Sequence, residues 1–228
     1  MTQLITRKEI FQSKKRIASE IIKIQQSFYD DELLQSYKDD NEEHLYWEMF
    51  DTVKAEPESY STHHKIIGLN HSDIDTYTGL LTQQLHLLLS GAGIKELIIL
   101  SHLKLDFFGN RENRFEPLVK SYKQLEKITG TTTYKEAFRF NIDSLGEWVN
   151  ILFWISRCDP SVSDYIFLFD PTEKIQFFIC KYGNIHFAEF DNEQFTAAKL
   201  NKLGWTIIEG QEFDNFSSDG KISGRQIK

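Results

Sequence analysis

Helical periodicity dominates the first part of this chain, and strand patterns gather in the last part. Residues 7–28 and 74–90 carry apolar side chains at helical spacing, whereas 164–170, 174–181 and 184–190 are short runs typical of strands. The chain lacks the regular alternation of strand and helix that predicts a parallel sheet. We therefore expect an α+β fold, with N-terminal helices packed on a mostly antiparallel β-sheet that the C-terminal half forms.

The same patterns predict how the chain divides. We expect a helical N-terminal region at residues 1–93 and, at 94–216, an α+β region that shares one core with it. Helices should cover one side of the sheet. From Ser217 onward the chain is polar and contains glycine, so 217–228 is predicted to be a disordered tail.

Local signals refine this outline. Thr6 begins a capping box with Glu9, and Ser72, Ser144 and Asn192 are further predicted helix N-caps. The apolar run 97–100 predicts a strand, and the alternation of apolar and polar residues at 103–107 predicts another. Residues 182–184 predict a tight hairpin turn.

Length and composition favour a soluble cytoplasmic protein. The 228 residues include no apolar stretch near the roughly 18 residues of a membrane span, and the N-terminus does not resemble a secretory signal. Without such a signal, Cys158 and Cys180 are expected to be reduced thiols.

Charge is strongly segregated along the sequence. Residues 28–58 carry eleven acids against two bases, and residues 159–219 carry eleven acids against four. An acidic surface repels phosphate backbones and attracts cationic proteins, which argues against a nucleic-acid or membrane partner and for a basic protein partner. The predicted contact residues are acids of the two blocks: Asp39, Asp40, Glu42, Glu43, Asp159, Asp164, Asp170 and Glu173.

Histidines and acids at 63–75 are the nearest approach to a metal cluster. His63 and His64 are adjacent and would point in different directions, no cysteine lies nearby, and the helical zinc-protease spacing is absent. We therefore predict no metal site and no cofactor.

Cys180 and His186 could form a nucleophile and base only if they shared one face of the hairpin. With a two-residue loop at 182–183 or 183–184, alternation places His186 on the face opposite to Cys180. Only an odd-length loop or a bulge would bring them together, so we predict a buried structural thiol. Separately, Tyr182, His186, Trp205 and Phe213 could line a ligand pocket, although core packing explains them first.

These observations give one leading hypothesis and two rivals. The leading hypothesis is a non-enzymatic cytoplasmic binding protein that engages a basic protein through its acidic surfaces. By composition alone, a bacterial immunity protein against a toxin has this profile. The rivals are a metal-assisted hydrolase whose site is assembled from scattered His and Asp residues such as His63 and His71, and a regulatory or structural module that oligomerises through its N-terminal helices.

Overall fold

The computed structural model describes residues 2–53, 60–220 and 222 of the chain. The described strands form one eight-stranded sheet in the order β1-β4-β3-β5-β6-β7-β2-β8, and every neighbouring pair is antiparallel. The strands are β1 (Gln3–Ile5), β2 (Thr62–Gly68), β3 (Glu96–Ser101), β4 (Ala137–Asn141), β5 (Ile166–Phe169), β6 (Ile175–Ile179), β7 (Ile185–Phe190) and β8 (Thr206–Ile207). The predicted α+β class is confirmed.

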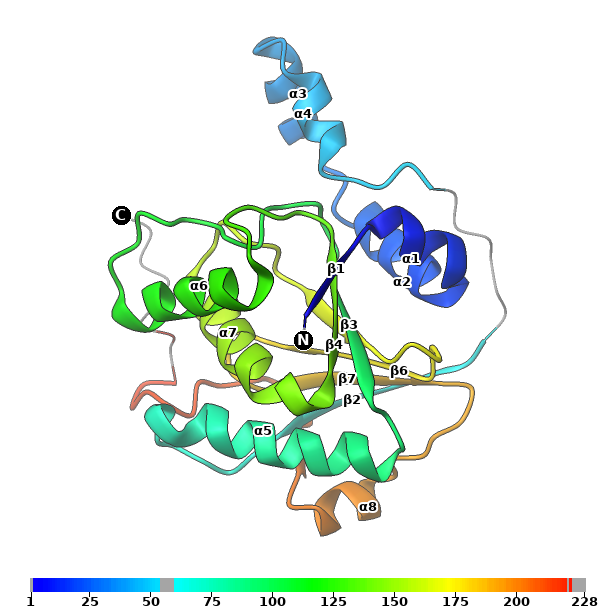
Figure 1. Cartoon of the computed structure of the whole chain (residues 1–228), viewed down its shortest axis with the longest axis vertical. Coiled ribbons are helices and arrows are strands. Elements are labelled where there is room, and N and C mark those ends of the chain that lie inside the picture. Colours follow the sequence, from blue (N-terminus) through cyan, green and yellow to red (C-terminus); the bar gives the residue numbers. More distant parts are fainter. Residues whose placement is uncertain (1, 54–59, 221, 223–228) are drawn as a thin grey trace.

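Helices cover both faces of this sheet, not one as we expected (Figure 1). They are α1 (Arg7–Ser13), α2 (Lys15–Gln26), α3 (Asp31–Asp39), α4 (Glu43–Glu48), α5 (Ile74–Gly91), α6 (Glu116–Thr129), α7 (Leu145–Cys158) and α8 (Ala197–Lys202), with a 3₁₀ turn at Ile142–Ser144. The larger core lies between the sheet and α5, α6 and α7. A smaller core lies between the opposite face and α1 and α2.

Strand β3 shows why both faces need a cover. Leu97 and Ile99 belong to the larger core, and Ile98 and Leu100 belong to the smaller one. A continuous apolar run is the pattern expected of a strand that is buried on both faces. The apolar stripe of α1 and α2 therefore packs inside the chain, so this stripe is not available for oligomerisation.

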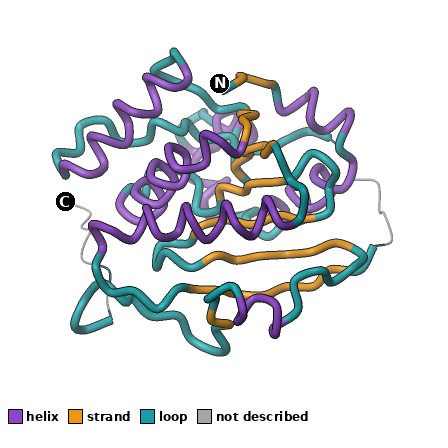
Figure 2. Tube along the Cα trace, turned by 60° about the horizontal axis from the view of Figure 1, so that its bottom comes forward, coloured by secondary structure: helices purple, strands orange, loops and turns teal. Residues whose placement is uncertain are grey.

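Two strands of the sheet lie where the sequence predicted helices or loops. Both β1 and β2 come from the first 93 residues. β1 forms one edge of the sheet, and β2 lies between β7 and β8 near the opposite edge (Figure 2). β2 begins with four polar residues, Thr62 to Lys65, and this concealed its strand character. Conversely, residues 103–107 form no strand. Instead the Asp106 carboxylate accepts hydrogen bonds from the Phe108 and Tyr134 amides, both at 3.0 Å.

The predicted capping residues have mixed outcomes. The Thr6–Glu9 capping box is present. Asp73, not Ser72, caps α5, and Thr196, not Asn192, caps α8. Ser144 makes no side-chain capping bond to α7. Where several adjacent residues could each cap, the register of the helix against the core decides between them, and a local pattern does not contain that register.

The C-terminal end of the described chain forms a turn. The Gly220 amide donates to the Ser217 carbonyl at 3.3 Å, and the Asp214 amide donates to Gly220 at 3.1 Å. The rest of the tail predicted at 217–228, namely 221 and 223–228, lies outside the described residues. Over the described residues, no helix has the length and apolarity needed to cross a membrane.

His102 is buried directly after β3 and gives the fold a pH dependence. Its side chain is fully shielded from solvent, and burial lowers its pKa from 6.5 to about 4, although nearby Asp164 acts in the opposite direction. The unfolded chain therefore binds this proton more readily than the folded chain does. We expect His102 to leave the free energy of unfolding unchanged well above pH 6.5. Protonation of this residue in the unfolded chain should lower that free energy by about 3 kcal/mol as the pH is lowered to 4.

Chemical denaturation of the wild type and of a His102→Gln variant from pH 7 to pH 4 would measure this contribution. The free energy of unfolding of the wild type, relative to that of the variant, should fall as the pH falls, because only the wild type has the His102 side chain that takes up a proton on unfolding. A constant difference across that range would contradict the assignment.

Candidate functional site

Residues 29–50 form an acidic arm that stands away from the body of the protein (Figure 1). The arm consists of α3 and α4 joined by a short turn. It contains eight acids and one lysine. No residue of α3 is buried, and within α4 only Tyr46 is. The arm is therefore a charged projection whose surface is available to another molecule.

The arm also exposes large apolar side chains. Tyr29, Leu33, Leu45 and Trp47 are between 39% and 49% exposed. The ring of Trp47 packs edge-on against Tyr29 and Tyr46, with centroids 6.0 and 5.0 Å apart. Single exposed apolar residues are ordinary on a soluble protein, but several on one small projection indicate a contact surface.

The first predicted group of acids lies together at the bend of this arm. Asp39 ends α3, Asp40 caps it, and Glu42 and Glu43 begin α4 after Asn41, which has a φ of 61°. All four acids are exposed. The structure thus brings these four carboxylates to one turn.

The second predicted group does not form a surface of this kind. Asp159 is fully buried and accepts hydrogen bonds from the amides of Asn110 at 2.7 Å and Ser161 at 2.8 Å. Asp170 is 1% exposed, and its carboxylate binds the amides of Lys174 and Ile175 in the turn after β5. Buried carboxylates that are satisfied within the chain cannot meet a partner, so we assign both a structural role.

The other two members of that group differ from each other. Glu173 is half-buried and accepts hydrogen bonds from the amides of Arg16 and Ile17 at 2.9 and 3.0 Å. It therefore caps α2 at the point where the helix predicted over 7–28 is interrupted, at Lys14. Asp164 is the one exposed member of the four.

A groove of about 720 Å³ lies beside α2, where the sheet face is left uncovered. Its floor comes from strands β6, β7 and β2, and α2 and the segment after β8 form its walls. The lining residues that have polar side chains are Glu20, His64, Lys65, Tyr165, Gln176, His186 and Glu209. A volume of this size falls within the range of ligand pockets. Of the four aromatic or imidazole residues that we considered for a pocket, His186 lines this groove.

Cys180 and His186 share one face of the β6–β7 hairpin, contrary to the prediction. Ile179 pairs with Ile185, and the Cys180 amide donates to the Asn184 carbonyl at 2.9 Å, so the loop contains three residues, 181–183. Gly183 adopts a φ of 86°, which suits the left-handed position of a three-residue loop. An odd loop length changes the register by one residue and moves His186 to the face that carries Cys180.

Glu212 joins these two side chains and was not among the predicted site residues. Its Oε2 lies 3.1 Å from the Cys180 sulfur, and its Oε1 lies 2.9 Å from His186 Nε2. Burial and the adjacent carboxylate raise the pKa of the Cys180 thiol to about 12. The thiol is thus protonated at neutral pH, which argues against a cysteine nucleophile.

The histidines near residue 70 do not assemble a comparable group. His71 donates to or accepts from Thr76 at 2.8 Å, and Asp73 caps α5. Among the residues that the structure describes, the group of three or more potential metal ligands is Cys180, His186 and Glu212, and it includes neither His63 nor His71. The hydrolase hypothesis based on His63 and His71 therefore gains no support from geometry.

No protein-family model, curated protein or solved structure matches this chain.

Proposed function

We propose that this protein binds a basic protein surface through its acidic arm. The observation that carries the proposal is the combination of exposed aromatic and aliphatic side chains with eight acids on one projection. The helix α3 contributes no buried residue to a core, so its side chains are available to a partner. A basic toxin that this protein neutralises, as an immunity protein would, is one partner of this kind.

The two kinds of residue have separate physical roles. Carboxylates of one sign steer a cationic partner towards the arm and exclude acidic competitors. Trp47 and Tyr29 offer the large rigid contact area that commonly dominates binding energy once water is excluded. Acidic charge alone gives weak binding that salt screens, whereas the apolar side chains supply contacts that persist.

The structure also favours a protein over a phosphate-bearing partner. The arm has one lysine, Lys38, which lies 3.9 Å from Glu43. Nucleic acids and anionic membranes need cationic surfaces, and this surface has the opposite sign.

Charge reversal at the bend tests the proposal. We expect Asp40→Lys with Glu42→Lys to abolish co-purification of a specific basic protein from the native host, because both carboxylates are exposed at the bend. Glu112→Lys with Glu126→Lys changes the net charge by the same amount on exposed positions outside the arm, and this control should retain the partner. Affinity capture with quantitative mass spectrometry at low and high salt would compare the three proteins.

Two outcomes would contradict the proposal. Equal loss in the arm variant and in the control would show that net charge acts without a site. Full retention in the arm variant at both salt concentrations would show that the arm is not the contact surface. A captured protein should then be purified and its affinity measured with a Trp47→Ala variant, whose loss of binding would implicate the apolar contacts.

A further inference from the structure

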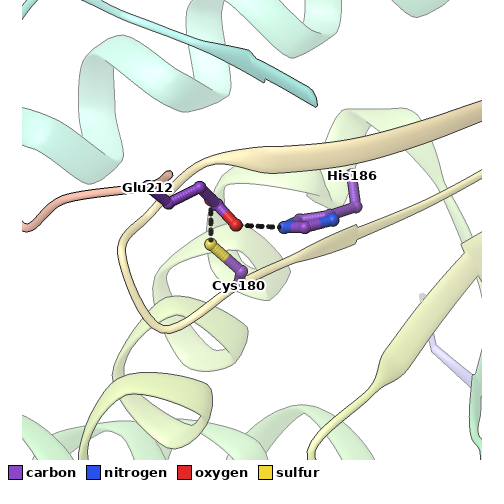
Figure 3. A group of neighbouring side chains, drawn as sticks. All are labelled: Cys180, His186 and Glu212. Atoms are coloured by element: carbon purple, nitrogen blue, oxygen red, sulfur yellow. Dashed lines mark hydrogen bonds and ion pairs between the residues drawn. The ribbon is translucent and has the colours of Figure 1, made fainter. Parts of the chain in front are cut away.

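Three potential metal ligands from separate parts of the chain converge at the end of the β6–β7 hairpin (Figure 3). Cys180 follows β6, His186 lies in β7, and Glu212 comes from the segment after β8. One ligand atom from each residue lies within 4.8 Å of the other two. The cluster is separate from the acidic arm, so its assignment does not depend on the proposed function.

We propose that Cys180, His186 and Glu212 bind a zinc ion. A thiolate, an imidazole and a carboxylate together are a donor set that Zn²⁺ accepts, whereas Mg²⁺ and Ca²⁺ prefer oxygen ligands alone. Tetrahedral zinc, with bonds of about 2.0–2.3 Å, separates its donor atoms by roughly 3.2–3.7 Å. One ligand atom from each residue lies within 4.8 Å of the other two, so the side chains need to approach one another by at most roughly 1.6 Å to reach these tetrahedral separations.

Neighbouring residues hold these ligands in position. The Asn184 side-chain Nδ2 donates to Glu212 Oε2 at 2.8 Å, which orients the carboxylate. The Phe178 ring stacks on His186 with centroids 4.4 Å apart and planes 13° apart. Supporting contacts of this kind fix metal ligands and contribute to affinity.

The backbone also leaves room for the Asn184 side chain that orients Glu212. Gly68 lies beside Asn184, and a Cβ on that glycine would stand 2.7 Å from the Asn184 side-chain oxygen. Asp214, two residues after Glu212, forms a buried ion pair with Arg157 of α7, with Oδ2 and Nη2 2.8 Å apart. The segment that carries Glu212 is thus attached to the body of the protein.

Access and proton balance are compatible with a metal. The side chains of His186 and Glu212 are 28% and 14% exposed, so an ion can reach them from solvent. Zn²⁺ would replace the thiol proton of Cys180, which passes to solvent, and the imidazole would carry its proton on Nδ1. Three protein ligands leave a fourth position for water or another donor.

A network of hydrogen bonds without metal is the alternative explanation, and metal titration separates the two. The full chain, freed of metal with a chelator, should bind one Zn²⁺ per chain by calorimetry. Co²⁺, added alone as a spectroscopic probe, should produce a thiolate-to-metal charge-transfer band, because a cysteine sulfur is among the ligands. The wild-type result already decides the matter if a variant fails to fold.

Variants assign the ligands. Cys180→Ser should remove the charge-transfer band, and His186→Gln and Glu212→Gln should each weaken Zn²⁺ binding more than Asn184→Ala, for which we expect about 10- to 100-fold. Cys158→Ala and His63→Gln should leave the titration unchanged, since neither residue belongs to the cluster. Absence of stoichiometric Zn²⁺ binding in the wild type, or a charge-transfer band that survives in Cys180→Ser, would overturn the proposal.

Discussion

Replacement of Asp51 by alanine should lower the free energy of unfolding by about 3–5 kcal/mol, because it leaves the buried Arg7 guanidinium without its counter-ion. The two side chains are 2% and 8% exposed, and the Arg7 Nε–H donates to Asp51 Oδ1 at 3.1 Å. Gln25 donates to the same carboxylate at 2.9 Å, and Arg7 also donates to the Ser101 carbonyl at 2.8 Å. The carboxylate therefore connects α1 and α2 to the chain that leaves the acidic arm.

Chemical denaturation followed by circular dichroism would measure the effect. Glu116→Ala is the matched control, since it breaks an ion pair with Lys120 whose two side chains are 77% and 71% exposed. An exposed pair contributes little, so the control should unfold like the wild type. A loss below about 1 kcal/mol for Asp51→Ala would contradict the buried network, because it would mean that water reaches the guanidinium.

Replacement of Leu100 by alanine should lower the free energy of unfolding by about 2–5 kcal/mol. Leu100 is fully buried in β3, an interior strand, and belongs to the core beneath α1 and α2 with Ile17 and Ile21. Its truncation leaves a cavity that two helices and the sheet cannot close together without distortion. The expected loss of stability therefore includes both the free energy gained by burying the leucine side chain and the cost of the cavity that its truncation leaves.

Leu87→Ala is the control for this prediction, since Leu87 lies in α5 and is 50% exposed. Its free energy of unfolding should stay within about 0.5 kcal/mol of the wild type. If Leu100→Ala proved equally mild, the contact between α1, α2 and the sheet would be wrong, since that contact is what buries the residue.

The fold class and most of its elements could be predicted from periodicity. The strands around residues 97–100, 166–169 and 185–190 could be predicted because most of their side chains are buried and their sequences are therefore rich in apolar residues. β2 could not be recognised, because its first four residues, Thr62 to Lys65, are polar, and His64 and Lys65 line a groove. That helices cover both faces of the sheet can be inferred from the apolar run 97–100 only once β3 is known to be an interior strand.

The site was less predictable than the fold, for two physical reasons. Side-chain direction in a hairpin depends on loop length. We predicted a two-residue loop, but residues 181–183 form a three-residue loop, which reverses the predicted direction of His186 relative to Cys180. Glu212 lies in a segment without regular structure, and no sequence spacing connects it to Cys180. A glycine at position 183, before the strand-like run, was the available signal for the longer loop.

Acidic residues near turns were similarly hard to separate by role. Asp159 and Asp170 are the same residue type as Asp39 and Asp40 of the arm, yet both are buried and accept hydrogen bonds from backbone amides within the chain. Short turns need such acceptors as much as binding surfaces need charge. What distinguishes Asp39 and Asp40 is their position on a projection that exposes its apolar side chains, which becomes visible only in three dimensions.

The most direct test of the acidic arm is amide hydrogen exchange measured on the purified protein with and without a basic partner obtained by capture. We expect binding to slow exchange in residues 29–50 and to leave exchange on the α5–α7 face unchanged. Slower exchange confined to the groove beside α2, or to the α5–α7 face, with the arm unaffected, would contradict it.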